Sequence, residues 1–215
     1  MKKYAIFFCA LYCAIMLSNN TDRAIGSFIA GTNTGIWFKK GDITHSKHEA
    51  IVNAANEQLA HGAGVCGAIF AAAGADELQK ECDAYPVIDN NVRCPVGQAR
   101  VTSSCNLKKQ GIQCIIHAVG PDCRIIKDTK KQDALLRDAY YNSLLLADEQ
   151  HVTSIAFPFI SSAIYAFPKE RAAQIAVDTV REYICAHRKT CVTSVTFILF
   201  SQADFDLFAH MPVKK

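Results

Sequence analysis

The sequence Ile51-Val52-Asn53-Ala54-Ala55-Asn56, followed after four residues by His61-Gly62-Ala63-Gly64-Val65-Cys66-Gly67-Ala68-Ile69-Phe70, places a loop of small residues between two apolar runs. This order predicts a buried strand, a loop and an apolar helix. Backbone N–H groups at the start of such a helix are free of bulky side chains and can bind a phosphate. The carboxamide of Asn56 adds a neutral group that can hold a sugar hydroxyl or a water.

A second segment has the same order of strand, small residues and helix. It reads Ile155-Ala156-Phe157-Pro158-Phe159-Ile160-Ser161-Ser162-Ala163-Ile164-Tyr165-Ala166-Phe167-Pro168. In open α/β sheets, ligands bind beyond the carboxyl ends of the strands. Two such loops could enclose one diphosphate from both sides. Taken alone, each segment also fits an ordinary tight turn from a strand to a helix.

The chain around these segments alternates between strand and helix patterns. Strands are predicted over residues 35–38, 50–54, 98–102, 113–119, 154–157 and 192–200. Helices are predicted over residues 65–73, 76–84 and 132–149, and another begins at Pro168. This alternation predicts one α/β domain with helices on both sides of a sheet.

The composition favours a small anionic ligand over a polymer. The chain has 215 residues, of which half are hydrophobic and a fifth are charged, and its formal net charge is +3. That length suits one domain plus an extension. No basic stripe of the kind that binds nucleic acid is present, so we expect no specific nucleic-acid partner. We also expect a monomer that needs no metal or other cofactor.

The N-terminus has the pattern of a secretory signal peptide, with Lys2 and Lys3 before the uncharged stretch 4–17 and the polar stretch 18–23. The apolar run is shorter than a membrane-spanning helix requires. Asp22 and Arg23 spoil the cleavage site that would end at Ala24. We therefore predict a signal peptide or anchor over residues 1–24, with the domain over 35–210. An apolar element packed on the domain is the alternative, so both an exported and a cytoplasmic location stay open.

Cysteine usage does not decide the compartment. The chain has ten cysteines, two of them within residues 1–24, and no C-x-x-C pair, which argues against a zinc ribbon or a thioredoxin-like site. An even number would permit disulfides after export. Cys114 and Cys185 are predicted in apolar settings, where a free cysteine acts as a small hydrophobic residue. We expect mostly reduced, buried thiols.

Taken together, five segments resemble the macro domain family in order and spacing. They are Gly41-Asp42-Ile43-Thr44, Asn53-Ala54-Ala55-Asn56, residues 61–67, Ile115-Ile116-His117-Ala118-Val119-Gly120-Pro121, and residues 155–168. The similarity covers residues 35–208. It implies a three-layer α/β/α fold with a mixed central sheet, and it implies ADP-ribose or an ADP-ribosylated protein as the partner.

The resemblance also implies a site. Its ligand-binding residues would be Asp42, Ile43, Ala55, Asn56, Gly62, Ala63, Gly64, Val65, Cys66, Gly67, Ser161, Ser162, Ala163, Ile164, Tyr165 and Phe200. Asp42 would accept a hydrogen bond from the adenine amino group, Tyr165 would pack on the distal ribose, and Phe200 would stack on adenine. Asn56 would contact the distal ribose and hold the attacking water as the catalytic residue.

Each role has a structural alternative. Asp42 could cap a turn, Asn56 could order its loop, and Phe200 could be a core aromatic residue. Asn53 and His117 are better explained as structural residues of their strands.

Four residues depart from the family pattern. Ala63 stands where a glycine is usual, which would cost about 1 kcal/mol if the position needs a positive φ. Ala163 and Ala166 replace glycines of the second segment and would narrow the space for phosphate. Cys66 occupies the place of an aspartate thought to position the water.

The exchange at Cys66 leaves three functions open. A thiol of ordinary pKa is a poor general base, although a helix start can produce a reactive thiolate. Other macro domains without this aspartate are still regarded as hydrolases, in which the diphosphate, the asparagine and backbone N–H groups arrange the water. Hydrolysis of an ester at the distal ribose of ADP-ribose or O-acetyl-ADP-ribose is therefore the leading hypothesis. A non-catalytic ADP-ribose reader and an exported interaction module without this ligand are the alternatives.

Overall fold

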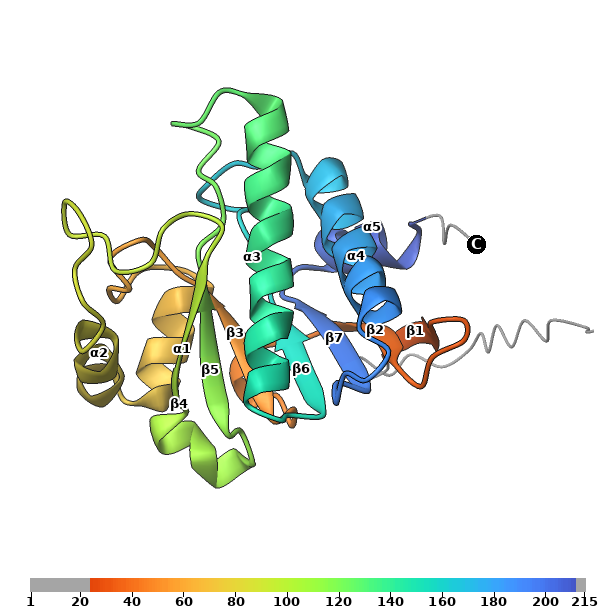
Figure 1. Ribbon diagram of the computed structural model, residues 1–215, viewed down its shortest axis with the longest axis horizontal. Coiled ribbons are helices and arrows are strands. Elements are labelled where there is room, and N and C mark those ends of the chain that lie inside the picture. Colours follow the sequence, from red (N-terminus) through yellow and green to blue (C-terminus); the bar gives the residue numbers. More distant parts are fainter. Residues whose placement is uncertain (1–23, 212–215) are drawn as a thin grey trace, which may run out of the picture.

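One mixed sheet organises the fold in the computed structural model, which describes residues 24–211. Its strands are β1 (Ile25–Phe28), β2 (Gly35–Lys40), β3 (Ala50–Ala54), β4 (Ala99–Ser103), β5 (Cys114–Ala118), β6 (Ser154–Phe157) and β7 (Ser194–Leu199). They lie in the order β1-β2-β7-β6-β3-β5-β4, and only the outer strands β1 and β4 are antiparallel to their neighbours (Figure 1). The carboxyl ends of the inner strands therefore meet at one edge of the sheet.

Helices cover both faces of this sheet. They are α1 (Val65–Ala73), α2 (Ala75–Asp83), α3 (Thr129–Glu149), α4 (Lys169–Ala186) and α5 (Gln202–Ala209), with the 3-10 turns η1 (Ile43–His45) and η2 (Cys105–Gln110). Helices α3 and α4 stand side by side on one face, where α5 also packs, and α1 packs with η1 and η2 on the other (Figure 1). The predicted three-layer α/β/α architecture is confirmed.

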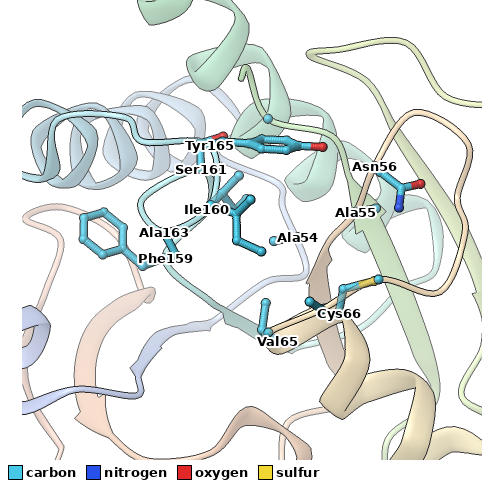
Figure 2. A pocket seen from close by; sticks show the side chains of 15 residues that line it. Ala54, Ala55, Asn56, Val65, Cys66, Phe159, Ile160, Ser161, Ala163 and Tyr165 are labelled. Carbon is cyan, nitrogen blue, oxygen red and sulfur yellow. The ribbon is translucent and has the colours of Figure 1, made fainter. Parts of the chain in front are cut away.

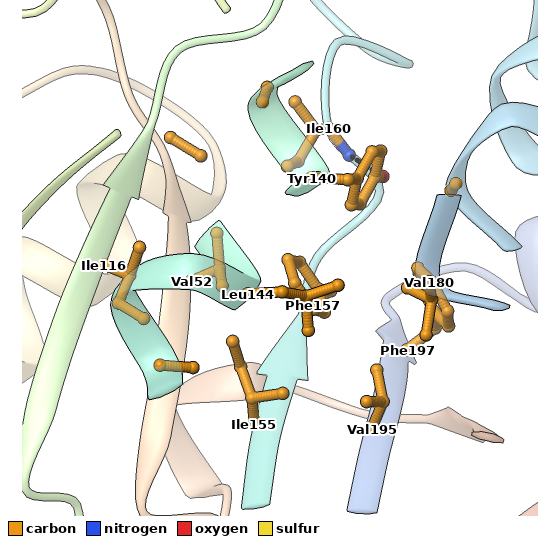
Figure 3. Close-up of a cluster of buried hydrophobic side chains, with 14 of the residues drawn as sticks. Val52, Ile116, Tyr140, Leu144, Ile155, Phe157, Ile160, Val180, Val195 and Phe197 are labelled. Atoms are coloured by element: carbon orange, nitrogen blue, oxygen red, sulfur yellow. Dashed lines mark hydrogen bonds between the residues drawn. The ribbon is translucent and has the colours of Figure 1, made fainter. Parts of the chain in front are cut away.

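Alternate residues of each inner strand point into two separate cores. On β6, Ile155 and Phe157 face α3 and α4, whereas Ala156 faces α1. Figure 3 shows the first of these cores, in which the rings of Phe157 and Phe197 stack with their centroids 5.8 Å apart and Leu144 of α3 belongs to the same cluster. Each such side chain contributes about 1.5–3 kcal/mol when fully buried. Because both faces are covered, the inner strands are apolar at nearly every position, as predicted for β7.

Local signals set the helix starts. The carboxylate of Asp128 accepts hydrogen bonds from the N–H groups of Lys130 and Lys131 and so caps α3. Pro168 immediately precedes α4, as predicted. The other predicted helices and strands are present with shifts of a few residues at their ends.

The structure adds elements that the sequence patterns did not predict. Strand β1 extends the sheet upstream of residue 35, where we placed the start of the domain. Helix α5 and both 3-10 turns were also missed. The predicted signal segment lies almost entirely outside the described residues. Within residues 24–211, no helix is both long and apolar enough to cross a membrane.

All eight cysteines among the described residues are free thiols. Cys114 is buried in the core, as expected, but Cys185 is exposed. The apolar setting predicted for Cys185 is therefore wrong. Tyr183 and Ile184 occupy the buried face of α4, and the next residue along the helix is rotated away from it.

Candidate functional site

A cavity of about 210 Å³ opens at the carboxyl edge of the sheet, between two loops. The first loop, residues 55–64, joins β3 to α1, and the second loop, residues 158–168, joins β6 to α4. The cavity is lined by Ala54, Ala55, Asn56, Gly62, Ala63, Gly64, Val65, Cys66, Gly120, Phe159, Ile160, Ser161, Ala163, Ile164 and Tyr165. None of these side chains is an acid, a lysine or an arginine. Figure 2 shows Asn56 and Cys66 on one side and Tyr165 projecting from the other.

Asn56 holds the first loop closed. Its Nδ2 donates to the carbonyl of Ala60, and its Oδ1 accepts from the N–H of Ala60, both at 2.9 Å. From outside the cavity, Oε1 of Gln79 accepts from the N–H of His61 at 2.9 Å. The structure thus gives Asn56 the loop-ordering role that the sequence left open, and it also places this side chain at the cavity wall.

Two glycines allow the first loop to meet α1. Gly64, the N-cap of the helix, has a φ of 63°, in the left-handed region that favours glycine. Gly67 lies in the first turn of α1, where a Cβ atom would come within 2.7 Å of the carbonyl oxygen of Gly62. The missing side chain at Gly67 therefore lets the first loop pack closely on α1. Gly67 itself does not line the cavity.

Ala63 does not carry the strain that a positive φ at this position would have imposed. Ala63 is not among the residues with positive φ, and the left-handed residues of this loop are Leu59, with a φ of 56°, and Gly64. In the second loop, Ser161 and Ala166 have φ values of 60° and 52°. Such a conformation costs an L-residue about 1–2 kcal/mol, so both loops carry strain, at Leu59 in the first and at Ser161 and Ala166 in the second. The sequence alone could not distinguish the strained positions from Ala63, because residue type does not determine φ.

Cys66 is a buried, neutral thiol at the base of the cavity. Its side chain is 4 % exposed, and Nδ2 of Asn53 lies 3.6 Å from its Sγ. Burial raises the pKa of Cys66, although N–H donors from Asn53 and Gly62 oppose the shift. A raised pKa disfavours the reactive thiolate that the start of α1 could otherwise have produced.

Asn53 and His117 form a buried polar pair behind this thiol. Asn53 Nδ2 lies 3.1 Å from His117 Nδ1, and His117 Nε2 lies 2.9 Å from the hydroxyl of Thr102. Burial lowers the pKa of His117 to about 4, so the imidazole is neutral at pH 7. The structural roles that we expected for both residues agree with these contacts.

The second loop is fixed by the helix layer. The N–H of Ile160 donates to the hydroxyl of Tyr140, a buried residue of α3, at 3.2 Å (Figure 3). Ser161 is also buried. A Cβ atom at Gly120, which follows β5, would lie 2.6 Å from Cγ2 of Ile160 and closer still to Oγ of Ser161.

Gly120, Ala54, Phe159 and Ile160 line the cavity although the sequence did not single them out. Gly120 lies in one of the segments that carried the resemblance, directly after an apolar strand. The end of that strand was the signal that could have identified it, because ligands bind beyond the carboxyl ends of inner strands.

The residues expected at adenine lie apart from this cavity. Asp42 and Phe200 follow the neighbouring strands β2 and β7, which are joined there by a hydrogen bond from Gly41 N–H to the carbonyl of Leu199 at 3.0 Å. Oδ1 of Asp42 accepts from the N–H and the hydroxyl of Thr44, so Asp42 does cap a turn. Phe200 is 83 % exposed, which excludes a core role.

Five of the predicted ligand-binding residues do not line the cavity, namely Asp42, Ile43, Gly67, Ser162 and Phe200. Ile43 is buried beneath the β2–β7 edge. The other predicted residues meet around the cavity. No group of three His, Cys, Asp or Glu side chains within residues 24–211 is arranged to hold a metal ion.

Comparison with known proteins agrees with this architecture. Residues 52–176 match the family described as Macro domain. A macro domain-containing protein of Listeria monocytogenes is 44% identical over 170 residues, which cover 79% of this chain and 92% of that protein. An O-acetyl-ADP-ribose deacetylase of Escherichia fergusonii is 45% identical over 172 residues, covering 80% and 92%.

A solved structure gives the same result. The Oceanobacillus iheyensis macrodomain with ADP superposes with a TM-score of 0.77 at 34% identity and covers 87% of this chain and 93% of that one. The chain belongs to the macro domain family.

Proposed function

We propose that this macro domain binds ADP-ribose in the cavity between its two loops and hydrolyses an ester at the distal ribose. The reaction would release mono-ADP-ribose from an acidic side chain of a protein, or acetate from O-acetyl-ADP-ribose. The observation that carries the proposal is the placement of Asn56 and the start of α1 on one wall of an uncharged cavity. The name of the Escherichia fergusonii relative and the ADP in the Oceanobacillus iheyensis structure support this choice.

The diphosphate would lie between Gly64 and Ser161. The first N–H groups of α1, at Val65 and Cys66, have no acceptor one turn earlier in the helix, and both residues line the cavity. Such groups, together with the helix dipole, favour an anion. Because no lysine or arginine lines the cavity, the backbone would supply most of the attraction.

Adenine would extend from this cavity toward the ends of β2 and β7. A cavity of about 210 Å³ is smaller than the ~300–1,000 Å³ typical of pockets for drug-sized ligands, so it suits the diphosphate and the distal ribose alone. Asp42 and Phe200 follow the neighbouring strands β2 and β7 at that edge. The exposed ring of Phe200 would then stack on adenine, and Asp42 would accept from its amino group.

The proposed hydrolysis does not use a protein base. Cys66 is neutral, and Asn56 can donate and accept hydrogen bonds but cannot take up a proton. Asn56 Nδ2 and Oδ1 each retain one further hydrogen-bonding position beyond those used for Ala60. These could hold the distal ribose and the water, and donors fixed in advance supply much of a rate enhancement. Asn56 already donates to and accepts from the backbone of Ala60, and this loop-ordering role is the observation that favours a non-catalytic reader.

Calorimetry separates these functions from an interaction module without this ligand. We expect the purified protein to bind ADP-ribose with a Kd below about 1 mM, with adenosine, which lacks the diphosphate, as the control ligand. Absence of heat with millimolar ADP-ribose would contradict both the hydrolase and the reader. Release of ADP-ribose from an automodified protein then distinguishes the two.

Cys66→Ala tests the role of the thiol. If water attacks without help from sulfur, we expect the variant to release ADP-ribose within about 3-fold of the wild-type rate, since it removes only a neutral group. The steady-state rate with one automodified substrate measures this. Loss of release with unchanged ADP-ribose affinity would instead point to a thiolate nucleophile.

A further inference from the structure

A charged turn lies outside the cavity against its second loop. This turn, residues 121–126, follows β5 and contains Asp122 and Arg124. Nε and Nη2 of Arg124 donate to Oδ1 and Oδ2 of Asp122 at 2.9 and 2.6 Å. The pair is bidentate, and the hydrogen bonds from Arg124 hold the pKa of Asp122 below its usual range. Neither residue lines the cavity.

The turn is closed by its own hydrogen bonds and is bonded to Tyr165. The carbonyl of Asp122 accepts from the N–H groups of Ile125 and Ile126 at 3.0 and 2.9 Å, and its Oδ1 accepts from the N–H of Arg124 at 2.9 Å. The N–H of Cys123 donates to the carbonyl of Tyr165 at 2.9 Å. The backbone beside Arg124 is therefore hydrogen-bonded to Tyr165, and the Arg124 side chain approaches the ring of that same residue.

Arg124 lies against the ring that closes the cavity. Its Cζ atom is 5.9 Å from the centroid of the Tyr165 ring, within the range of a cation–π contact. Figure 2 shows this ring across the cavity from Asn56. The loop that carries Tyr165 contains two residues of positive φ, Ser161 and Ala166, and such a backbone persists only where surrounding contacts hold it. The helix layer holds the loop at Ile160, and Arg124 makes such a contact at the Tyr165 ring itself.

We propose that Arg124, oriented by Asp122, is a positioning residue that holds the Tyr165 ring at the distal-ribose end of the cavity. The inference rests on the proposed function, because it assigns that end to the distal ribose. Arg124 would thereby favour ADP-ribose over ADP, which lacks that ribose. Arg124 would act through Tyr165 and would not touch the ligand itself.

Paired titrations of ADP-ribose and ADP test this assignment. We expect Arg124→Ala to weaken ADP-ribose binding by about 3- to 10-fold and to leave ADP binding unchanged. Arg124→Lys should behave in nearly the same way, because an ammonium group cannot form the bidentate pair with Asp122. Arg137→Ala is the matched control: Arg137 lies over Tyr141 at 5.5 Å and pairs with Glu182 on the helix layer. It should change neither affinity.

A double-mutant cycle supplies the decisive measurement. If Arg124 acts through the ring, then Arg124→Ala has no further effect on ADP-ribose affinity in a Tyr165→Ala background. An undiminished effect in that background would overturn the proposal, since Arg124 would then meet the ligand directly. An equal loss of ADP and ADP-ribose affinity would also overturn it. In either of these two cases the wild-type protein still binds ADP-ribose. If the proposed function is wrong, the wild-type protein itself does not bind ADP-ribose, so the two failures can be distinguished.

Discussion

Asn56→Ala is expected to lower kcat/KM for release of ADP-ribose by at least about 100-fold, the loss typical when one fixed donor is removed from a catalytic site. The variant also loses both hydrogen bonds between Asn56 and Ala60. We therefore expect the free energy of unfolding to fall by about 1–2 kcal/mol. Initial rates on an automodified protein and denaturant unfolding measure the two effects.

Gln79→Ala is the control for loop order. Gln79 lies outside the cavity but holds the same loop, accepting from the N–H of His61 and donating to the carbonyl of Leu59. If Asn56 contacts the reacting groups, Gln79→Ala should cost less than about 5-fold in kcat/KM. Equal losses of kcat/KM in the two variants would mean that Asn56 only orders its loop. Unchanged release by Asn56→Ala would refute its catalytic assignment.

The sheet and most helices could be predicted because they depend on local patterns. Apolar runs such as residues 194–199 are buried on both faces, and Pro168 marks a helix start. Helix α5 was missed although a local signal exists. Ser201 accepts from the N–H of Asp204 and donates to its carboxylate, a Ser-x-x-Asp start related to the capping box. Strand β1 offers no such signal, since its residues are exposed and only pairing with β2 defines it.

The cavity could be predicted in outline for a topological reason. Parallel inner strands bring the ends of β3 and β6 to one edge, so the two loops meet whatever their detailed shape. Their conformation could not be predicted. The left-handed positions fall at Leu59, Gly64, Ser161 and Ala166, which no local pattern marks. The residues behind the loops act through contacts distant in sequence. The hydrogen bond from Ile160 to Tyr140 is such a contact.

Gly120→Ala is expected to have the second large effect because the second loop packs directly against the backbone of Gly120. The added Cβ atom would lie 2.6 Å from Cγ2 of Ile160, well inside normal contact distance. Ile160 cannot withdraw easily, since it is buried and bonded to Tyr140, and Ser161 already has a left-handed backbone. We expect the free energy of unfolding to fall by about 1–3 kcal/mol through overpacking.

The same clash should move the second loop and weaken ADP-ribose binding by at least about 10-fold, roughly 1.4 kcal/mol. Gly41→Ala is the control for stability. Gly41 follows β2 at the same edge, where a Cβ atom would meet Cγ2 of Ile198 at an ordinary 3.8 Å. Ser161→Gly should restore part of both losses in the Gly120→Ala background, because it removes Oγ and relieves the positive φ. Wild-type stability and affinity in Gly120→Ala would mean that the second loop is not packed against the backbone of Gly120.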